Sequence, residues 1–293
     1  MLSTDSRQYR FAYEICSRSD VPGDFPGVPS EDEWLAALFM PGDTDAFWQP
    51  PEYSPRIYLL KRDRLLVYSH PASHEGLFET PLNALIAVEL QKSLLYGVVQ
   101  FHVATASGKF RYCTVHQRLF NRFLHSLRSQ WLKSTELNGP VLAMQHTVLH
   151  SSARCFRELT GELDPDEVLY QQYCQPTFQV KEQTWFFIRS RSAPALLIAV
   201  TNLRLIAVST GAGERNDPYE MAIRYAPTNG LSVVDVASGI SGSVILQIQL
   251  KNNVIWKFTL SDAQSPSVSR FLTTVRNLIA AGCDDGPSVQ IPE

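Results

Sequence analysis

The chain has 293 residues, 44% of them hydrophobic and 19% charged, and a net charge of −3 at neutral pH. This length predicts about two domains, and the composition is typical of a folded soluble protein. No stretch approaches the roughly 18 consecutive apolar residues of a membrane-spanning helix, and a pI of about 6.2 argues against a nucleic-acid-binding domain.

The cysteines and the N-terminus indicate a cytoplasmic protein. Five cysteines are scattered along the chain without a C-x-x-C pair. An odd number in a chain of this length argues against a disulfide framework. The first residues contain no apolar signal core, which argues against export. We therefore expect reduced thiols in a cytoplasmic protein, with peripheral attachment to a membrane left open.

Charge is distributed unevenly along the first half of the chain. Residues 1–55 contain three basic and ten acidic residues, whereas residues 56–133 contain eleven basic and four acidic residues. The basic stretch therefore either lies against the acidic N-terminal segment or faces an anionic partner.

The N-terminal extension predicts little regular structure. Residues 9–15 are typical of a strand or an arm, and residues 21–30 are rich in Pro and Gly. Ser30 and Glu33 have the spacing of a capping box, so we expect a short helix over 31–39.

After the extension, the hydrophobic pattern becomes regular. Two extended runs over 54–70 flank a turn at 61–63, and a hairpin over 99–114 alternates apolar and polar residues. Apolar residues then recur at helical spacing over 119–131, which predicts an amphipathic helix. The pattern breaks at 137–140, which we interpret as the domain junction.

The second half has a similar order of elements. We expect a helical segment near 146–160, strands over 168–174, 184–190 and 196–201, a hairpin over 244–260 and a helix over 266–280. The hairpin turns at 251–253, because Asn tolerates the positive φ of tight turns. Pro266 suits the first position of the final helix, and Gly282 suits its end.

Three short matches relate the two halves of the chain. Residues 56–69 match 196–209 at an offset of 140, 81–90 match 227–236 at an offset of 146, and 122–128 match 270–276 at an offset of 148. The matches occur in the same order, and small differences in loop length explain the drift in offset. Together they indicate an internal duplication.

Several short strands followed by one amphipathic helix resemble the pleckstrin-homology (PH)-like fold, in particular its bacterial PH-like and GRAM-like group. The residues that carry this resemblance are LLIAVTNLRLIAVS (196–209) with its T-N-x-R-L strand pair, the hairpin 244–260 and the helix 266–280. The first copy departs from the pattern, because KRD (61–63) replaces TNL (201–203). The resemblance implies a mainly β protein with helices, built as two PH-like, partly open barrels that are each closed by a C-terminal amphipathic helix.

The resemblance also implies a domain organisation and a function. We expect a first PH-like domain with its N-terminal extension over 1–137, a second over 141–282 and a disordered tail over 283–293. Family membership implies a non-catalytic binding or scaffold protein that needs no cofactor. Our first hypothesis is a protein partner that adds a strand to a sheet edge or docks beside the final helix. The alternatives are a peripheral membrane adaptor that reads anionic lipid headgroups, and an enzyme with a dispersed site between the domains.

Two groups of basic residues are candidates for binding an anion or a lipid headgroup. The first domain contains Lys61, Arg62, Arg64, Lys109 and Arg111, of which the last two share one face of a strand. The second domain contains Lys181, Arg189 and Arg191. The Arg189-Ser190-Arg191 run has the basic-x-Arg form of phosphoinositide-binding members of the family. The alternative for both groups is an ordinary charged rim.

The histidines and the helix arginines favour ordinary structural roles. His70 and His74, like His146 and His150, have i, i+4 spacing, but the sequence has no H-E-x-x-H motif and no second ligand cluster. We therefore expect no metal site. Arg122, Arg128, Arg270 and Arg276 occupy matched positions in the two predicted final helices, which indicates a structural role such as an ion pair.

Overall fold

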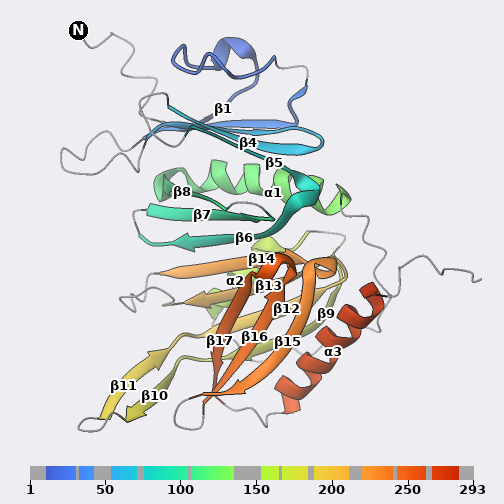
Figure 1. The fold of residues 1–293 in the computed structure, drawn as a ribbon. Helices are drawn as coiled ribbons and strands as arrows, with labels where there is room; N and C mark the ends of the chain where they lie inside the picture. The colour runs from blue at the N-terminus through green and yellow to red at the C-terminus, as the bar shows by residue number, and fades with distance from the viewer. Residues whose placement is uncertain are drawn as a thin grey trace, which may run out of the picture. The chain divides into compact units, whose positions relative to one another are not determined.

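The protein is described by a computed structural model, and it is mainly antiparallel β with a few helices (Figure 1). The structure describes residues 11–30, 33–42, 54–70, 76–94, 96–104, 107–134, 153–164, 167–183, 188–210, 220–239, 243–261 and 266–283. The chain divides into two compact units, Met1–Glu136 and Leu137–Glu293. The predicted class, mainly β with helices, is confirmed, although no sheet of the described residues closes into a complete barrel.

The first sheet of unit 1 has five antiparallel strands in the order β1-β2-β3-β4-β5. The strands are β1 (Tyr13–Glu14), β2 (Ala36–Met40), β3 (Arg56–Leu60), β4 (Arg64–Ser69) and β5 (Leu77–Pro81). Every residue of β3 is buried. A strand that is apolar on both sides requires cover on both faces of its sheet.

The segment between β1 and β2 covers one of these faces. Phe25 and Val28 are buried in one apolar cluster with Ile15, Phe39 and Ile57. The rings of Phe25 and Phe39 meet edge to face with their centroids 6.3 Å apart. The N-terminal extension, to which the sequence assigned no role, is therefore part of the core of unit 1.

The helix predicted over 31–39 is wrong. Residues Ala36–Met40 form strand β2, which pairs with β1 on one side and with β3 on the other. The run from Trp34 to Met40 is almost continuously apolar, so it fits a helical and an extended period alike. The backbone pairing with β3 selects the extended form.

The second half of unit 1 is a three-stranded meander followed by a helix. Its elements are β6 (Leu85–Lys92), β7 (Tyr96–Val103), β8 (Gly108–Cys113) and α1 (Gln117–Ser134), with short 3-10 turns η5 (Leu82–Ala84) and η6 (Thr114–His116). The strands pair in chain order. The predicted apolar stripe of α1 is confirmed, because Phe120, Phe123, Leu124, Leu127 and Trp131 are buried.

Tyr58 joins the two halves of unit 1 from the middle of β3. Its ring lies 5.2 Å from that of Phe120 and 5.7 Å from that of Phe123, both on α1. It also meets Phe110 of β8, with centroids 6.1 Å apart. At the far end of the helix, Trp131 Nε1 donates to the Leu85 carbonyl at 3.1 Å. The second face of β3 is thus closed by α1 and β8.

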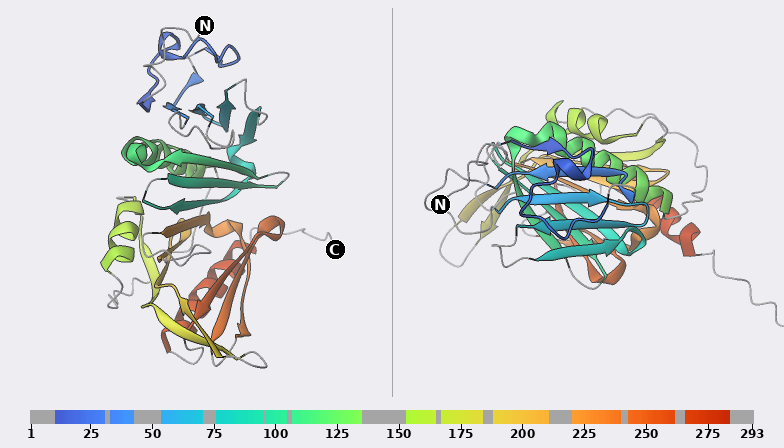
Figure 2. Two further views of the ribbon diagram at one scale, coloured as in Figure 1. Left: turned by 90° about the vertical axis from the view of Figure 1, so that its left-hand side faces the viewer. Right: turned by 90° about the horizontal axis from the view of Figure 1, so that it is seen from above.

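Unit 2 contains the same two kinds of sheet and an added hairpin (Figure 2). One set of strands pairs in the order β9-β12-β13-β14, and another in the order β15-β16-β17. The strands are β9 (Leu169–Gln175), β10 (Phe178–Gln183), β11 (Ile188–Ala193), β12 (Leu196–Thr201), β13 (Arg204–Thr210), β14 (Met221–Pro227), β15 (Leu231–Ser238), β16 (Val244–Leu250) and β17 (Ile255–Leu260). The helices are α2 (Ala153–Glu162) and α3 (Pro266–Cys283), with turns η7 (Thr228–Gly230) and η8 (Lys251–Asn253).

The hairpin of β10 and β11 departs from the predicted strands. Strand β10 was not predicted, and its sequence FQVKEQ is mostly polar. The strand expected over 184–190 begins at Ile188 in the structure, and residues 184–187 lie outside the described residues. The expected strand at 168–174 is confirmed as β9 with a one-residue shift.

The end of unit 2 was predicted most accurately. Asn252 and Asn253 have φ values of 59° and 63°, so the expected positive-φ turn is confirmed. The predicted stripe on α3 is buried at Val268, Phe271, Val275 and Leu278. Pro266 is the first helical residue, and the helix continues through Gly282 to Cys283.

A hydrogen-bonded corner and a helix join the two sheets of unit 2. Gln175 at the end of β9 donates from Nε2 to the Thr259 carbonyl at 2.8 Å, and its Oε1 accepts from the Ser261 N–H at 3.3 Å. Helix α3 packs against both β9 and β15. One helix therefore contacts a strand from each sheet.

The connection between the two sheets has the same backbone design in both units. Pro81 and Pro227 each precede a one-turn 3-10 helix. Leu82 N–H donates to the Asp63 carbonyl at 2.7 Å, and Thr228 N–H donates to the Leu203 carbonyl at 3.0 Å. The strand that follows has a register shift at its first residues in both units, in β6 and in β15.

We predict that Phe25→Ala destabilises the protein by about 3 kcal/mol, because it leaves a cavity under the N-terminal segment. Urea denaturation followed by intrinsic fluorescence measures this loss. Phe11→Ala is the matched control, since Phe11 is 69% exposed and its truncation leaves no buried cavity. Equal urea midpoints for the two variants would show that the N-terminal segment is not part of the core.

Candidate functional site

The basic turn predicted as an anion site in unit 1 is largely neutralised by carboxylates. Lys61 forms an ion pair with Glu33. Arg64 Nη1 lies 2.6 Å from a carboxylate oxygen of Glu79, and its Nη2 lies 2.9 Å from one of Asp63. These carboxylates hold the pKa of Arg64 above its ordinary value. Arg62 is exposed, and its carbonyl accepts a 2.7 Å hydrogen bond from Gln130.

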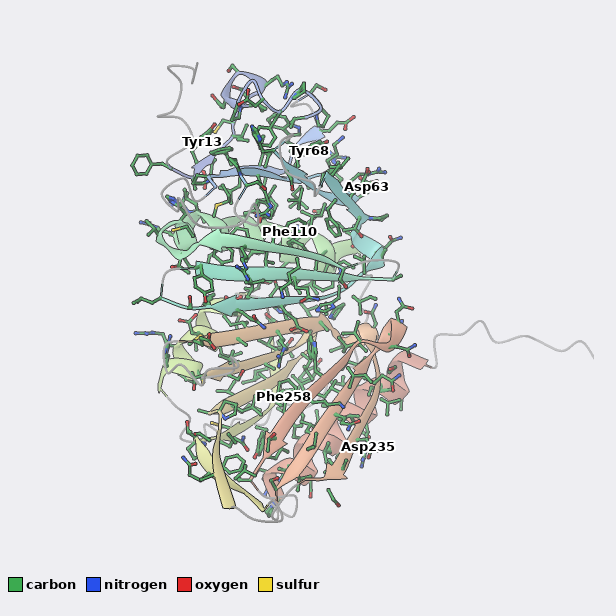
Figure 3. All side chains as sticks on the ribbon, turned by 60° about the vertical axis from the view of Figure 1, so that its left-hand side comes forward. Tyr13, Asp63, Tyr68, Phe110, Asp235 and Phe258 are labelled. Carbon is green, nitrogen blue, oxygen red and sulfur yellow. The ribbon has the colours of Figure 1, made fainter. Side chains whose placement is uncertain are left out.

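The structure does not bring Lys109 and Arg111 to this turn. Arg56, at the other end of β3, donates to the Arg111 carbonyl at 3.0 Å. A strand rises about 3.3 Å per residue, so the two ends of the five-residue β3 are about 13 Å apart. Figure 3 labels Asp63 on the turn and Phe110 between the two basic residues of β8. The five predicted residues therefore form two separate groups.

In unit 2 the candidate residues lie on the hairpin of β10 and β11. Arg189 pairs with Glu182, Arg191 pairs with Val180, and Lys181 pairs with Ser190. The structure therefore places the three candidate residues on two neighbouring strands.

The T-N-x-R-L motif forms a buried ion pair that the sequence did not predict. Arg204 binds Glu167 through two hydrogen bonds, with Nε donating to Oε1 at 2.8 Å and Nη2 donating to Oε2 at 2.6 Å. The Arg204 side chain is 1% exposed and that of Glu167 is 0% exposed. Nη2 also donates to the Glu162 carbonyl at the end of α2, at 2.5 Å. One guanidinium thereby joins α2, the approach to β9 and the start of β13.

The other motif residues tighten the same junction. The Thr201 hydroxyl lies 2.6 Å from Glu167 Oε1 and accepts the Arg204 backbone N–H at 3.0 Å. Asn202 accepts the Val168 N–H on its side-chain oxygen at 2.8 Å, and its own N–H donates to the Val168 carbonyl at 3.0 Å. The motif therefore has a structural role, which is to close the β12–β13 turn over the start of β9.

Burial and pairing act in opposite directions on Glu167. Burial alone raises the pKa of this carboxyl, but the hydrogen bonds and the charge of Arg204, together with the Thr201 hydroxyl, hold it below its ordinary value. The carboxylate is therefore ionised at neutral pH, and its ion pair stabilises the folded state.

One end of unit 1 exposes four large apolar side chains, which we call the apolar tip: Phe11, Leu94, Tyr96 and Val115. The Thr114 hydroxyl donates to the Leu94 carbonyl at 2.8 Å, and Tyr96 pairs with Cys113 at the end of β8. The Phe11 ring meets His116 edge to face at 6.5 Å. Burial lowers the pKa of His116, so its imidazole is neutral at neutral pH. These contacts place Leu94 and Tyr96 beside the segment that carries Val115, and Phe11 beside His116.

Unit 2 offers a sheet edge at β15. No described strand pairs with its outer side. The Gly239 N–H donates to the Ser243 carbonyl at 2.9 Å, so Gly239 and every second residue before it direct their backbone groups toward β16. Because backbone groups alternate in direction, Val234, Val236 and Ser238 direct theirs outward. The Val236 N–H donates to the Asp235 carboxylate at 2.7 Å, so a side chain occupies one position of this edge.

The remaining predicted features form no second centre within the described residues. His70 Nε2 lies 3.6 Å from an Asp24 oxygen, whereas His74, His146 and His150 lie outside the described residues. No group of three or more potential metal ligands occurs in the part of the chain that the structure describes. The four described cysteines form no disulfide.

The arginines matched between α1 and α3 differ in their surroundings. Arg122 forms a 2.9 Å ion pair with Glu14 of β1, and Arg128 is buried. Arg270 and Arg276 are exposed. The matched positions therefore do not share one environment.

A comparison of the chain with models of protein families finds no match, and a comparison with curated proteins finds none either. Among the described helices, none has the length and apolar character needed to cross a bilayer.

We predict that Glu167→Gln lowers the free energy of unfolding by about 3 kcal/mol, because it leaves a buried guanidinium without its counter-charge. Chemical denaturation measures the change. Glu79→Gln is the matched control, since it removes a partner of Arg64 at an exposed site where water screens the charge. A Glu167→Gln variant as stable as Glu79→Gln would contradict the structural role of the motif.

We also predict a pH dependence of this contribution. The folded-state pKa of Glu167 lies below its ordinary value, so its stabilisation is complete above about pH 4.5 and is lost as the pH falls through the folded pKa. The stability gap between the wild-type chain and Glu167→Gln should therefore shrink as the pH is lowered from neutral toward about 3. A gap that stays constant over this range would argue against an ionised Glu167.

Proposed function

We propose that this chain is a non-catalytic binding protein of two PH-like units, and that unit 2 binds an extended segment of a partner protein at β15. The observation that carries the proposal is the outer edge of β15, which presents outward-directed backbone groups beside α3. Strand addition to such an edge gains affinity from main-chain hydrogen bonds and specificity from alternate side chains.

The order of elements supports the PH-like assignment. In each unit, antiparallel strands lead through a 3-10 turn into a three-stranded meander and then a long helix. In unit 2, α3 contacts a strand of each sheet, as the helix that closes a corner does in the PH-like fold. The shared turn after Pro81 and Pro227, with its equivalent hydrogen bond, supports a tandem origin for the two units.

The surroundings of β15 indicate the chemistry of the bound segment. Val233 on this strand is 49% exposed, and Leu272 and Ile279 at the margin of the buried face of α3 are half-buried. A segment with apolar residues at alternate positions would cover these side chains. Asp235 is exposed on the same face of β15 as Val233, so it favours a basic residue opposite it.

The buried carboxylate of Glu167 in unit 2 is poorly suited to catalysis, which supports the proposal of a non-catalytic protein. Glu167 already accepts hydrogen bonds from Arg204, Thr201 and the Asp164 N–H. A carboxylate held by so many donors, and with a lowered pKa, is a poor general acid or base at neutral pH.

The test begins with short random peptides displayed in a library and selected on the full chain. We expect binders with alternating apolar residues that slow amide hydrogen exchange at Val234 and Ser238, because their outward N–H groups become bonded. Ser238→Pro removes one such N–H and should weaken binding about tenfold, which corresponds to one lost backbone hydrogen bond.

The matched control is Ser238→Ala, which removes the side chain but keeps the N–H. Proline is tolerated where a strand N–H points away from its sheet, so both variants should fold. The proposal fails if the selected peptides bind the Pro and Ala variants equally, or if they protect amides outside β15.

A further inference from the structure

The outer face of the sheet formed by β15, β16 and β17 exposes apolar side chains. Val234 and Ile248 are buried and face the core, so the residues that alternate with them face outward. On this outer face Val233 is 49% exposed and Ile255 is 48% exposed. Both are register partners of Gln249, so the two apolar side chains stand in one row across the sheet.

The three strands contain only two charged residues, and both lie on this outer face. Asp235 and Lys257 are the register partners of Gln247, one on each side of it, and both are exposed. Two strand spacings separate their backbones by about 9.5 Å. Figure 3 labels Asp235 of this face and Phe258 of the buried face. The outer face therefore has an acidic edge and a basic edge on either side of a neutral centre.

Unit 1 contains the same row at the matched position of its meander. Glu89, Gln100 and Lys109 are consecutive register partners on β6, β7 and β8. They align with the row of unit 2 at offsets of 146, 147 and 148, which agree with the internal duplication. In unit 1 the β6 side of this face is buried at Ala87, and Glu89 is largely covered and lies 3.1 Å from His102 Nε2. A sheet face of this design is therefore able to pack against protein.

We propose that the outer face of β15–β17 packs against the same face of a second copy of the chain in a two-fold symmetric dimer. With the two-fold axis parallel to β16, β15 of each copy lies over β17 of the other. Asp235 then faces Lys257 of the partner subunit, and symmetry makes this ion pair twice. Gln247 lies close to the axis, where two side-chain amides can each donate to and accept from the other.

The distribution of charge and apolar side chains favours a second copy as the partner. A face with one acidic and one basic edge is complementary to itself after a two-fold rotation, whereas a face of one charge repels its own copy. The same rotation places Val233 opposite Ile255 of the partner subunit, so both apolar side chains leave water together. An axis that runs across the strands would instead bring the two Asp235 side chains together, which repulsion disfavours.

The expected dimer is weak, because the face is small. The strands are eight, seven and six residues long and about 4.8 Å apart, so the interface lies at the lower end of the known size range. Sheets that stack face to face leave their edges open. The outward backbone groups of β15 therefore remain available to an added strand, and the dimer does not depend on the proposed function.

The experiment is sedimentation velocity of the full chain over a concentration series up to about 200 µM, which covers weak association. We expect a monomer–dimer equilibrium for the wild-type chain. Asp235→Lys and Lys257→Asp each place like charges opposite one another twice, so each should weaken the dimer at least about tenfold. The double variant with both changes restores opposite charges and should dimerise as the wild-type chain does.

A mixture of the two single variants gives the sharpest test. In a mixed dimer every acidic side chain of the middle row again faces a basic one. The mixture should therefore associate more tightly than either variant does alone. Such association also shows that both variants are folded.

Matched controls separate this face from other surfaces. Lys109→Asp reverses the matched lysine of unit 1 and should leave the dimer unchanged. Ser238→Pro should weaken peptide binding at the edge of β15 and leave the dimer intact. Ile255→Ser should weaken the dimer about tenfold, whereas Leu77→Ser, at a side chain 51% exposed on β5, should not. The inference is overturned if the wild-type chain stays monomeric throughout the series, or if the mixture associates no better than each single variant.

Discussion

Both units depend on central strands whose residues are buried on both faces of the sheet. All residues of β3 and of β12 are buried, and β13 is buried except at its last residue. Such strands cannot leave one face of their sheet to water, so each unit needs cover on two sides. In unit 1 the cover is α1 with β8 on one face and the segment around Phe25 on the other. In unit 2, α2 packs on β12 and β13. The segment around Phe25 in unit 1 and α2 in unit 2 therefore both cover a buried sheet face, although their structures differ.

The sequence predicted the features that depend on neighbouring residues, and it missed those that depend on contacts between residues far apart in the chain. Elements whose signal is local were found: the Asn252-Asn253 turn, the stripe of α1 and the stripe of α3. Strand β2 was missed because its continuous apolar run has no period, and its pairing with β3 is a tertiary effect. The acidic partners of the candidate basic residues at the turn could not be predicted for a similar reason. Lys61 is neutralised by Glu33, 28 positions away, and Arg64 by Glu79, 15 positions away. The apolar tip has no sequence signature, because exposure is a property of the fold.

The β3–β4 turn of unit 1 and the β12–β13 turn of unit 2 share a backbone hydrogen bond but differ in their side-chain contacts. The bond from Leu82 to Asp63 in unit 1 has an equivalent from Thr228 to Leu203 in unit 2. Around this shared backbone, unit 2 buries Arg204 against Glu167, whereas unit 1 leaves Arg64 on the surface between Asp63 and Glu79. Only the buried version can use the full strength of a bidentate pair, since water screens the exposed one. The T-N-x-R-L motif is thus explained by the attachment of α2 and the start of β9 to the β12–β13 turn. It does not by itself indicate a ligand.

The hairpin of β10 and β11 has a consequence for how this chain tolerates change in length. It leaves the sheet at Gln175 and returns at Leu196, and these two residues are direct register partners. The whole excursion therefore starts and finishes at one place, so its length does not enter the geometry of the strands that flank it. Loop-closure entropy grows only slowly with the number of residues, by about 0.6 kcal/mol for each doubling. The hairpin is accordingly a position in unit 2 where evolution, or a protein engineer, can lengthen, shorten or exchange a segment while the flanking strands keep their register.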